Sequence, residues 1–230
     1  MATMKSPTLT LLDTPQPAWF GTAPHAGSWR SWLLQGSAYG NVIDLGANQS
    51  LAADRGDFYI LLSGCIIVHG VSPQSSSKPI FVDALRCGDV ICPLRHDQVK
   101  FLYKTRTPAT LLKVSKDKYQ AFMNDLKYSE TVLLAAELHL MALHSNAAHL
   151  HFAKDLERIE RVVNVLVQHP DSTHTPRGTE VQASKEEIRT LAGVERRSGS
   201  RAFKTLEDEG VLFFNGYKAF FYKAPRKEMA

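Results

Sequence analysis

The feature that most constrains the fold is a run of about forty residues near the C-terminus, which predicts two short helices followed by a hairpin. Ser184 is a good helix N-cap, and Glu187 stands at the third helical position, so the pair forms a capping box. The first helix is expected to end at Gly193, because glycine readily adopts the left-handed conformation that closes helices. A second helix is predicted from Glu195 to Glu209, after a tight turn.

The predicted second helix has an apolar side and a basic side. Its apolar side, formed by Ala202, Phe203 and Leu206, is expected to pack on the first helix. In a helix-turn-helix the first turns of the second helix enter the major groove of DNA, where arginine can pair with guanine. The residues expected to read bases are Arg196, Arg197, Ser200 and Arg201, and those expected to contact phosphates beside them are Ser198 and Lys204.

A hairpin is predicted directly after the second helix. The segments Gly210–Phe214 and Tyr217–Tyr222 have strand character, and Asn215-Gly216 is a strong signal for a two-residue turn between them. A hairpin in this place is the wing of a winged helix-turn-helix. Asn215, Tyr217 and Lys218 at its tip are expected to reach the phosphate backbone.

Upstream, short apolar runs separated by turn residues predict an antiparallel β-roll that begins near residue 31. The predicted strands are Phe58–Leu62, Cys65–Val68, Ile80–Leu85, Val99–Tyr103 and Thr110–Val114. Ser115 is expected to cap a short helix over residues 116–127. Four prolines in the first thirty residues indicate an irregular arm.

A long helix is predicted next, because no glycine or proline occurs from Ser129 to His151. Apolar residues at three-four spacing form a seam typical of a parallel helix pair, namely Leu133, Ala136, Leu140, Leu143, Ala147 and Leu150. Leu134, Leu138 and Met141 form a neighbouring face that is expected to rest on the β-roll. The sequence thus predicts a dimerisation helix, with a buried core helix of one domain as the alternative.

The expected fold class is α+β. The predicted domains are an irregular arm over 1–30, a β-roll over 31–127, the dimerisation helix over 128–151 and the winged helix-turn-helix over 152–230. The last domain is expected to open with a helix from Phe152 to about Gln168, which ends before Pro170 and is followed by a polar loop over Asp171–Gly178.

Length, charge and cysteine content limit the classes of protein. The 230 residues carry a net charge of only +4, which excludes a histone-like electrostatic binder and permits a local basic face. No apolar stretch approaches the roughly 18 residues of a membrane span, and the N-terminus does not resemble a signal peptide. Three cysteines argue against a secreted disulfide scaffold, so a cytoplasmic protein is expected.

The C-terminal module resembles that of the CRP/FNR family of bacterial transcription regulators (the cyclic-AMP receptor and fumarate-nitrate regulator type). The matching runs are Ser184-Lys185-Glu186-Glu187-Ile188, Gly193-Val194-Glu195-Arg196-Arg197-Ser198-Gly199-Ser200-Arg201 and Leu206-Glu207-Asp208-Glu209-Gly210. The order of parts, β-roll, long helix and winged module, also fits over residues 32–223.

The resemblance implies a homodimer on a two-fold symmetric DNA site, acting at nearby promoters with RNA polymerase as a partner. It further implies that Arg196, Arg197 and Arg201 read bases, and that Ser184 and Lys185 lie near phosphates together with Asn215 and Tyr217. Arg197 replaces the glutamate common in the best-known members, so the preferred base is expected to change from cytosine to guanine.

The β-roll departs from the family, and no cofactor or metal is expected. Gly88-Asp89-Val90 resembles the turn before a nucleotide-binding cassette, but the Gly-Glu-Leu run and the phosphate-holding arginine are missing, so control by a cyclic nucleotide is not expected. Three cysteines cannot hold a four-thiolate iron–sulfur cluster. Cys87 and Cys92 are a possible redox pair or two ordinary thiols.

Two histidines on the long helix form another possible sensor. In a parallel pair His139 of one chain would lie beside His144 of the other, where protonation or zinc binding would act on the dimer; otherwise they are solvated flank residues. Two other classes of protein stay open. One is a regulator that uses the winged module to bind protein without DNA, and the other is a cupin-like β-roll enzyme, although no catalytic residues are expected.

Overall fold

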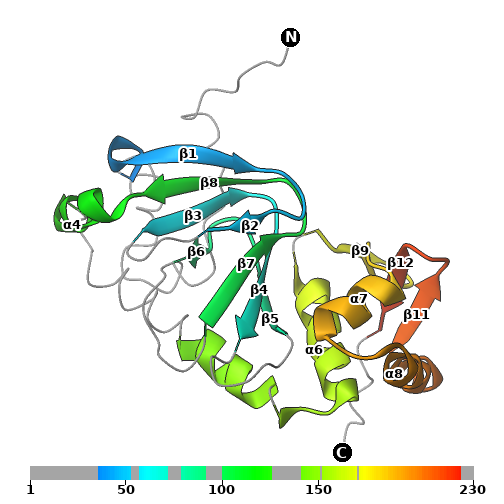
Figure 1. The fold of residues 1–230 in the computed structure, drawn as a ribbon. Helices are drawn as coiled ribbons and strands as arrows, with labels where there is room; N and C mark the ends of the chain where they lie inside the picture. Colours follow the sequence, from blue (N-terminus) through cyan, green and yellow to red (C-terminus); the bar gives the residue numbers. More distant parts are fainter. Residues whose placement is uncertain are drawn as a thin grey trace, which may run out of the picture. The chain divides into compact units, whose positions relative to one another are not determined.

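The computed structural model describes residues 36–52, 57–71, 79–91, 100–125, 141–150, 152–169 and 171–223 of the chain (Figure 1). The chain divides into two compact units. One comprises Met1–Val68 with Leu85–Ser145, and the other His69–Ala84 with Asn146–Ala230. Residues 69–84, which the sequence assigned to the β-roll, fall in the second unit, and the boundary at residues 145–146 lies inside the predicted dimerisation helix.

The β-rich region contains two four-stranded sheets. Within the described residues, the first sheet has the order β1-β8-β3-β6 and comprises Gly40–Leu45, Ala109–Val114, Phe58–Ser63 and Val90–Ile91, with every neighbouring pair antiparallel. The second has the order β2-β7-β4-β5 and comprises Ser50–Leu51, Lys100–Thr105, Ile66–Val71 and Ile80–Leu85. All five predicted strands are present, and the antiparallel β-rich fold is confirmed. The sequence missed β1, β2 and β6.

Strand β3 lies at the centre of the hydrophobic core of the first unit. Its sequence is almost wholly apolar, and Phe58, Ile60 and Leu62 on one side are at most 3% exposed. They pack with residues of β6, β8 and helix α4, namely Val90, Leu112, Val114 and Phe122. A strand buried in this way needs apolar residues throughout, which explains its lack of polar alternation.

Helix α4 (Lys116–Asp125) begins where the sequence predicted, but its first turn has an additional acceptor. The backbone amide of Lys116 donates to Asp57 Oδ1 at 2.9 Å, from a residue 59 positions earlier. Lys113 Nζ lies 2.6 Å from Asp57 Oδ2. Burial raises the pKa of Asp57, but the hydrogen bonds from Lys113 and the Lys116 amide outweigh it, so the net pKa is below 3.8.

Residues 141–150 are helical, as expected for the end of the long helix. Most of the predicted seam lies outside the described residues, namely Leu133, Ala136 and Leu140. The other three, Leu143, Ala147 and Leu150, are buried in the single chain and only 2%, 6% and 4% exposed.

The side of this helix that the sequence assigned to the β-roll is instead open to solvent. Met141 is 67% exposed, and Phe152 in the following turn is 86% exposed. At Met141, the one residue of that side within the described ranges, the expected contact with the β-roll is absent. A three-four spacing identifies an apolar side but cannot say which of two apolar sides faces the protein's own core.

The second unit contains helices α6 (Asp155–Gln168), α7 (Lys185–Ala192) and α8 (Arg196–Asp208). Its sheet has the order β11-β12-β10-β9, with strands Leu212–Asn215, Ala219–Tyr222, Gly178–Val181 and Thr173–Thr175. Helix α6 packs against α7 and α8 through an apolar side that includes Ile159, Val162, Val163 and Leu166, as expected. The prediction of a polar loop over Asp171–Gly178 is wrong, because this segment contains strand β9. A strand of only three residues is too short to be recognised from the sequence pattern.

Two details of the second unit differ from the prediction. Helix α6 begins at Asp155 instead of Phe152, since Glu157 accepts a hydrogen bond from the Lys154 amide at 3.1 Å and so sets a new helix start. Arg161 of α6 donates from Nη2 to the Val82 carbonyl at 3.3 Å and lies 3.8 Å from the Asp83 carboxylate. These contacts join residues of strand β5 to the second unit.

Candidate nucleic-acid interface

Helix α7 begins and ends where the sequence predicted. Ser184 is the N-cap, and its hydroxyl oxygen accepts a hydrogen bond from the Glu187 amide at 3.0 Å. Gly193 ends the helix at φ 63° and ψ 29°, in the left-handed region that favours glycine. The Val194 amide then donates to the Arg189 carbonyl at 3.1 Å, which keeps the turn tight.

Helix α8 presents two distinct sides. Ala202, Phe203 and Leu206 are buried, as predicted, and Gly199 is buried with them. The first turns expose four basic side chains, Arg196, Arg197, Arg201 and Lys204. Glu195 and Glu209 are the cap residues, so the helix is one residue shorter at each end than expected.

The expected base-reading residues are divided between two surfaces. Arg196 and Ser200 line a groove with residues of α7 and the hairpin, and the Ser200 hydroxyl donates to the Arg196 carbonyl at 2.9 Å. Arg197 borders a second hollow beside the α7–α8 turn, and Arg196 lines both this hollow and the groove. Arg201 is exposed but borders neither.

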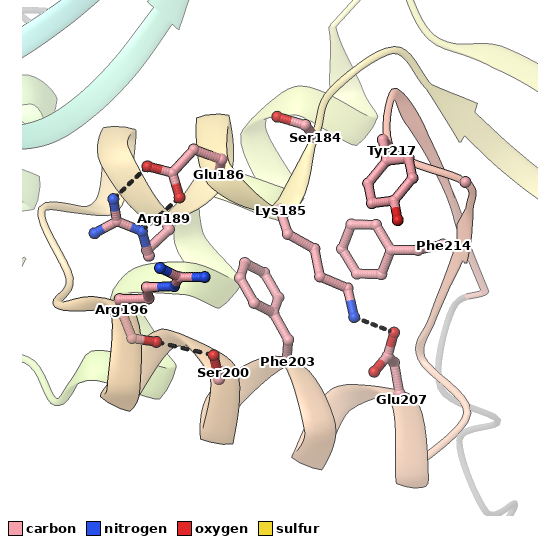
Figure 2. A pocket seen from close by; sticks show the side chains of 11 residues that line it. Ser184, Lys185, Glu186, Arg189, Arg196, Ser200, Phe203, Glu207, Phe214 and Tyr217 are labelled. Carbon is pink, nitrogen blue, oxygen red and sulfur yellow. Dashed lines mark hydrogen bonds and ion pairs between the residues drawn. The ribbon is translucent and has the colours of Figure 1, made fainter.

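We call the first of these surfaces the α8 groove (Figure 2). Its walls are formed by Ser184, Lys185, Glu186, Arg189, Arg196, Ser200, Phe203, Glu207, Phe214, Gly216 and Tyr217. Lys185, a predicted phosphate contact, crosses the groove to Glu207, with Nζ 2.7 Å from Oε1. The same ammonium lies 4.4 Å from the centre of the Phe214 ring, a distance suited to a cation–π interaction.

The hairpin of β11 and β12 follows α8, but its turn differs from the prediction. Asn215 pairs with Ala219, so the loop consists of Gly216, Tyr217 and Lys218, and the two-residue Asn-Gly turn is wrong. The register places Phe214 beside Phe220 and against Phe203 of α8, at ring distances of 5.8 and 5.5 Å. This aromatic packing determines the loop length.

All three predicted tip residues are nevertheless exposed. Tyr217 is 94% exposed and borders the α8 groove. Asn215 and Lys218, which precede and follow Tyr217 in the chain, are also exposed. The expected phosphate contacts Ser198 and Lys204 are half-buried and exposed, respectively. The hairpin tip and the start of α8 therefore both offer polar side chains to solvent.

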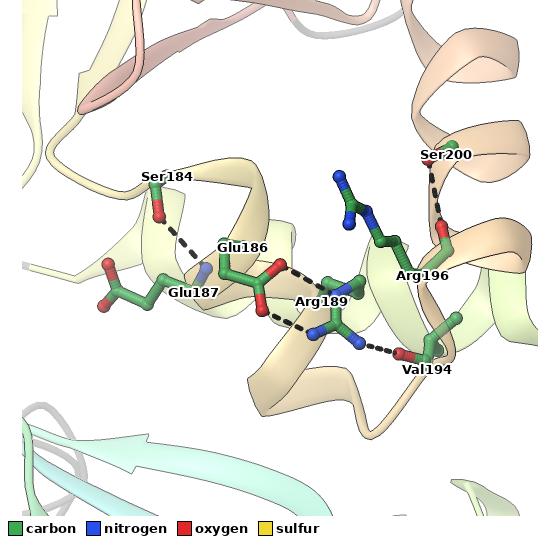
Figure 3. Close-up of polar contacts among 7 residues, drawn as sticks. All are labelled: Ser184, Glu186, Glu187, Arg189, Val194, Arg196 and Ser200. Carbon is green, nitrogen blue, oxygen red and sulfur yellow. Dashed lines mark hydrogen bonds and ion pairs between the residues drawn. The ribbon is translucent and has the colours of Figure 1, made fainter.

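Sequence reasoning missed the role of Arg189, which is bound at the α7–α8 turn (Figure 3). Its Nε and Nη2 donate to the two carboxylate oxygens of Glu186, and its Nη1 donates to the Val194 carbonyl at 2.7 Å. The hydrogen bond lowers the pKa of Glu186 and raises that of Arg189. An inward-facing glycine in the middle of α8, Gly199, is the sequence signal that could have pointed to this contact.

The possible sensor residues are not brought together by the described structure. Cys87 is half-buried, whereas Cys92 and His139 lie outside the described residues. The His144 ring lies 4.8 Å from the Phe101 ring of the same chain, so it contacts β7. In the described ranges, no group of three His, Cys, Asp or Glu residues could hold a metal ion.

The turn at Gly88-Asp89-Val90, which resembles the turn before a nucleotide-binding cassette, stabilises the local structure of the β-rich region. Gly88 adopts φ 93°, and the Asp89 carboxylate accepts a hydrogen bond from the Arg86 amide at 2.9 Å. The Leu61 amide donates to the Asp89 carbonyl at 2.9 Å, which ties the turn to β3.

No helix in the described part of the chain is long and apolar enough to span a membrane.

The chain is similar to known proteins in both sequence and structure. No family model matches the chain. By sequence it is similar to the CRP-like protein Clp of Xanthomonas euvesicatoria pv. vesicatoria, with 23% identity over 177 residues, 73% of this chain and 76% of that protein. The resemblance to the CRP/FNR family of transcription regulators is confirmed.

Solved structures of CRP/FNR regulators show the same fold. The c-di-GMP-responsive global regulator CLP of Xanthomonas campestris has a TM-score of 0.65 and 19% identity, over 84% of this chain and 99% of that chain. A CooA mutant from Carboxydothermus hydrogenoformans has a TM-score of 0.61 and 15% identity, over 83% and 87%. The CRP/FNR relatives are regulators by name, so the comparisons lend no support to a cupin-like enzyme.

Proposed function

We propose that this CRP/FNR-type chain is a sequence-specific DNA-binding regulator that acts as a homodimer on a two-fold symmetric site. In this proposal α7, α8 and the β11–β12 hairpin form a winged helix-turn-helix. The observation that supports it is the start of α8, where basic side chains are exposed while the opposite side of the same helix is buried. A helix held in this way can enter the major groove with its arginines foremost.

Each surface of the module has a separate part in the proposed contact. Arg196, Arg197, Ser200 and Arg201 read bases, since arginine pairs with guanine through two hydrogen bonds. The hairpin tip reaches the backbone of the duplex through Asn215, Tyr217 and Lys218. Ser184, Lys185, Ser198 and Lys204 complete the phosphate contacts.

The exposed side of the helix over residues 141–150 is the proposed dimer surface. Met141 and Ala148 are both exposed and lie seven residues, or about two helical turns, apart, so they form one stripe on this helix. This stripe replaces the buried Leu143, Ala147 and Leu150 as the described part of the seam. A second copy of the chain is the occupant, because a symmetric DNA site requires two recognition helices about one duplex turn apart, roughly 34 Å.

The proposed regulator works in the cytoplasm, and RNA polymerase is its expected partner at promoters. CLP is described as responsive to c-di-GMP. For the present chain we propose DNA binding without a cyclic nucleotide. The support is the sequence after Gly88-Asp89-Val90, which lacks the family's Gly-Glu-Leu run and phosphate-holding arginine.

Selection of bound duplexes from a randomised library by the purified full-length protein tests the proposal. We expect a palindromic motif with guanine at conserved half-site positions, and retardation of that duplex at concentrations that leave a scrambled duplex free. A library without enrichment would exclude DNA recognition and favour a module that binds protein. Enrichment of a single half-site would exclude the dimeric mode.

A further inference from the structure

We propose that Arg189 is a positioning residue for the start of α8, and that Gly199 is a glycine because Arg189 passes over it. The inference rests on the proposed function, since the start of α8 holds the proposed base-reading arginines. Arg189 itself need not touch DNA in this role. It acts by fixing the direction in which α8 leaves the turn.

The guanidinium of Arg189 joins two parts of the chain (Figure 3). Two of its nitrogens donate to Glu186, one turn earlier on α7. A third, Nη1, donates at 2.7 Å to the carbonyl of Val194, the residue just before the N-cap of α8. The planar guanidinium therefore connects the body of α7 with Val194, the last residue before the N-cap of α8.

The stem of Arg189 fits against α8 only because residue 199 lacks a side chain. A Cβ placed on Gly199 would lie 2.9 Å from Arg189 Cγ, closer than Cβ atoms approach other atoms in real structures, and a tight 3.1 Å from Cδ, so the arginine stem would have to shift. Glycine in a helix interior weakens the folding equilibrium roughly fivefold relative to alanine. An unfavourable residue at a buried, ordinarily helical position indicates that the space is needed.

The two features together hold the arginines of α8 in place. Arg189 closes the turn at Val194, and Arg196 and Arg197 follow within three residues. The carboxylate of Glu186 also lies near enough to Arg196 for their charges to interact. Loss of this guanidinium would let the α7–α8 angle vary, which lowers the affinity for correctly spaced bases more than the affinity for phosphates.

The test compares specific with non-specific binding in Arg189→Lys. Lysine keeps the charge and most of the stem but has one nitrogen, so it cannot serve Glu186 and Val194 in the same geometry. The probes are the duplex selected by the wild-type protein and a scrambled duplex of equal length. We expect the ratio of the two affinities to fall about tenfold, with the scrambled duplex bound within about twofold of wild type.

A double-mutant cycle provides a second readout that does not depend on overall stability. Gly199→Ala alone should displace Arg189 and reduce the same ratio about tenfold. In an Arg189→Ala background the nearest remaining atom, Arg189 Cβ, would be 3.8 Å away, so adding Gly199→Ala should cost nothing further. Additive losses in the double variant would overturn the inference, even if each single variant were impaired.

The control Arg201→Ala separates the two proposals. If the wild-type protein does not discriminate the selected duplex, the proposed function fails. If the wild type discriminates and Arg201→Ala does not, while Arg189→Lys retains the wild-type ratio, then only the positioning role of Arg189 is wrong. Urea unfolding of each variant establishes that the compared proteins are folded.

Discussion

Lys185 and Glu207 connect the first turn of α7 to the last turn of α8, with Nζ 2.7 Å from Oε1. The pair spans the α8 groove beneath the Phe214 ring (Figure 2). Lys185 is also a proposed phosphate contact, and in that role Glu207 would compete with a DNA phosphate for the one ammonium group. The free protein thus holds this cation in place at a modest electrostatic cost to DNA binding.

Glu207→Gln should therefore tighten DNA binding. Removing the competing carboxylate frees Lys185, and we expect about a two- to fivefold gain in affinity at moderate salt, because an exposed ion pair is worth at most about 1 kcal/mol. The measurement is a binding titration on the selected duplex. Asp208→Asn makes the same charge change at a neighbouring exposed residue, and an equal gain there would show that only net charge matters.

Arg197→Ala and Arg201→Ala should each cost about 1–3 kcal/mol on the preferred duplex and relax the choice of base at one position of each half-site. Lys204→Ala should weaken all duplexes about equally and reduce the salt dependence. Affinities for a set of duplexes with single-base changes distinguish the two effects. Uniform losses for both arginine variants would make them phosphate contacts.

The exposed stripe over residues 141–150 predicts a dimer that an introduced charge can disrupt. Ala148→Glu and Met141→Glu should convert the dimer to monomer, since each places a carboxylate in an apolar contact. Sedimentation analysis measures the association. Asn164→Glu, at an exposed position of α6, is the matched control. Unchanged association in both stripe variants would place the interface elsewhere.

Asp57 predicts an acid-sensitive component of stability. Its pKa is lowered in the folded protein, so the stabilisation is present above the usual value of 3.8 and is lost as the pH falls below it. Asp57→Asn should reduce the free energy of unfolding at neutral pH by about 1–3 kcal/mol and flatten the acid limb. Urea unfolding between neutral and acid pH checks this.

The parts of the structure that the sequence predicted correctly depend on local signals. Ser184 and Gly193 cap α7 through neighbouring backbone groups, and each can be recognised within one turn of helix. The strands of the β-rich region were found for the same reason, since apolar runs between turn residues are visible locally. The basic start of α8 was also evident from spacing alone.

The features that were missed depend on contacts between distant residues. The length of the β11–β12 loop follows from the packing of Phe214 on Phe203, which belongs to another element. Which side of the helix over residues 141–150 is exposed depends on which of its apolar stripes the rest of the chain covers. Arg189 was missed because its partner atoms are a carbonyl beyond the turn and the space above a glycine.

The Asp57 contact has a consequence for the order of folding. A helix of ten residues such as α4 is unstable in isolation, and one of its terminal amides is satisfied by a carboxylate 59 positions earlier. That carboxylate is adjacent to Lys116 only when strands β3 and β8 have paired in the register Phe58↔Val114. Strands β3 and β8 must therefore pair before this hydrogen bond can stabilise the helix, so we expect α4 to form late in the folding of the first unit.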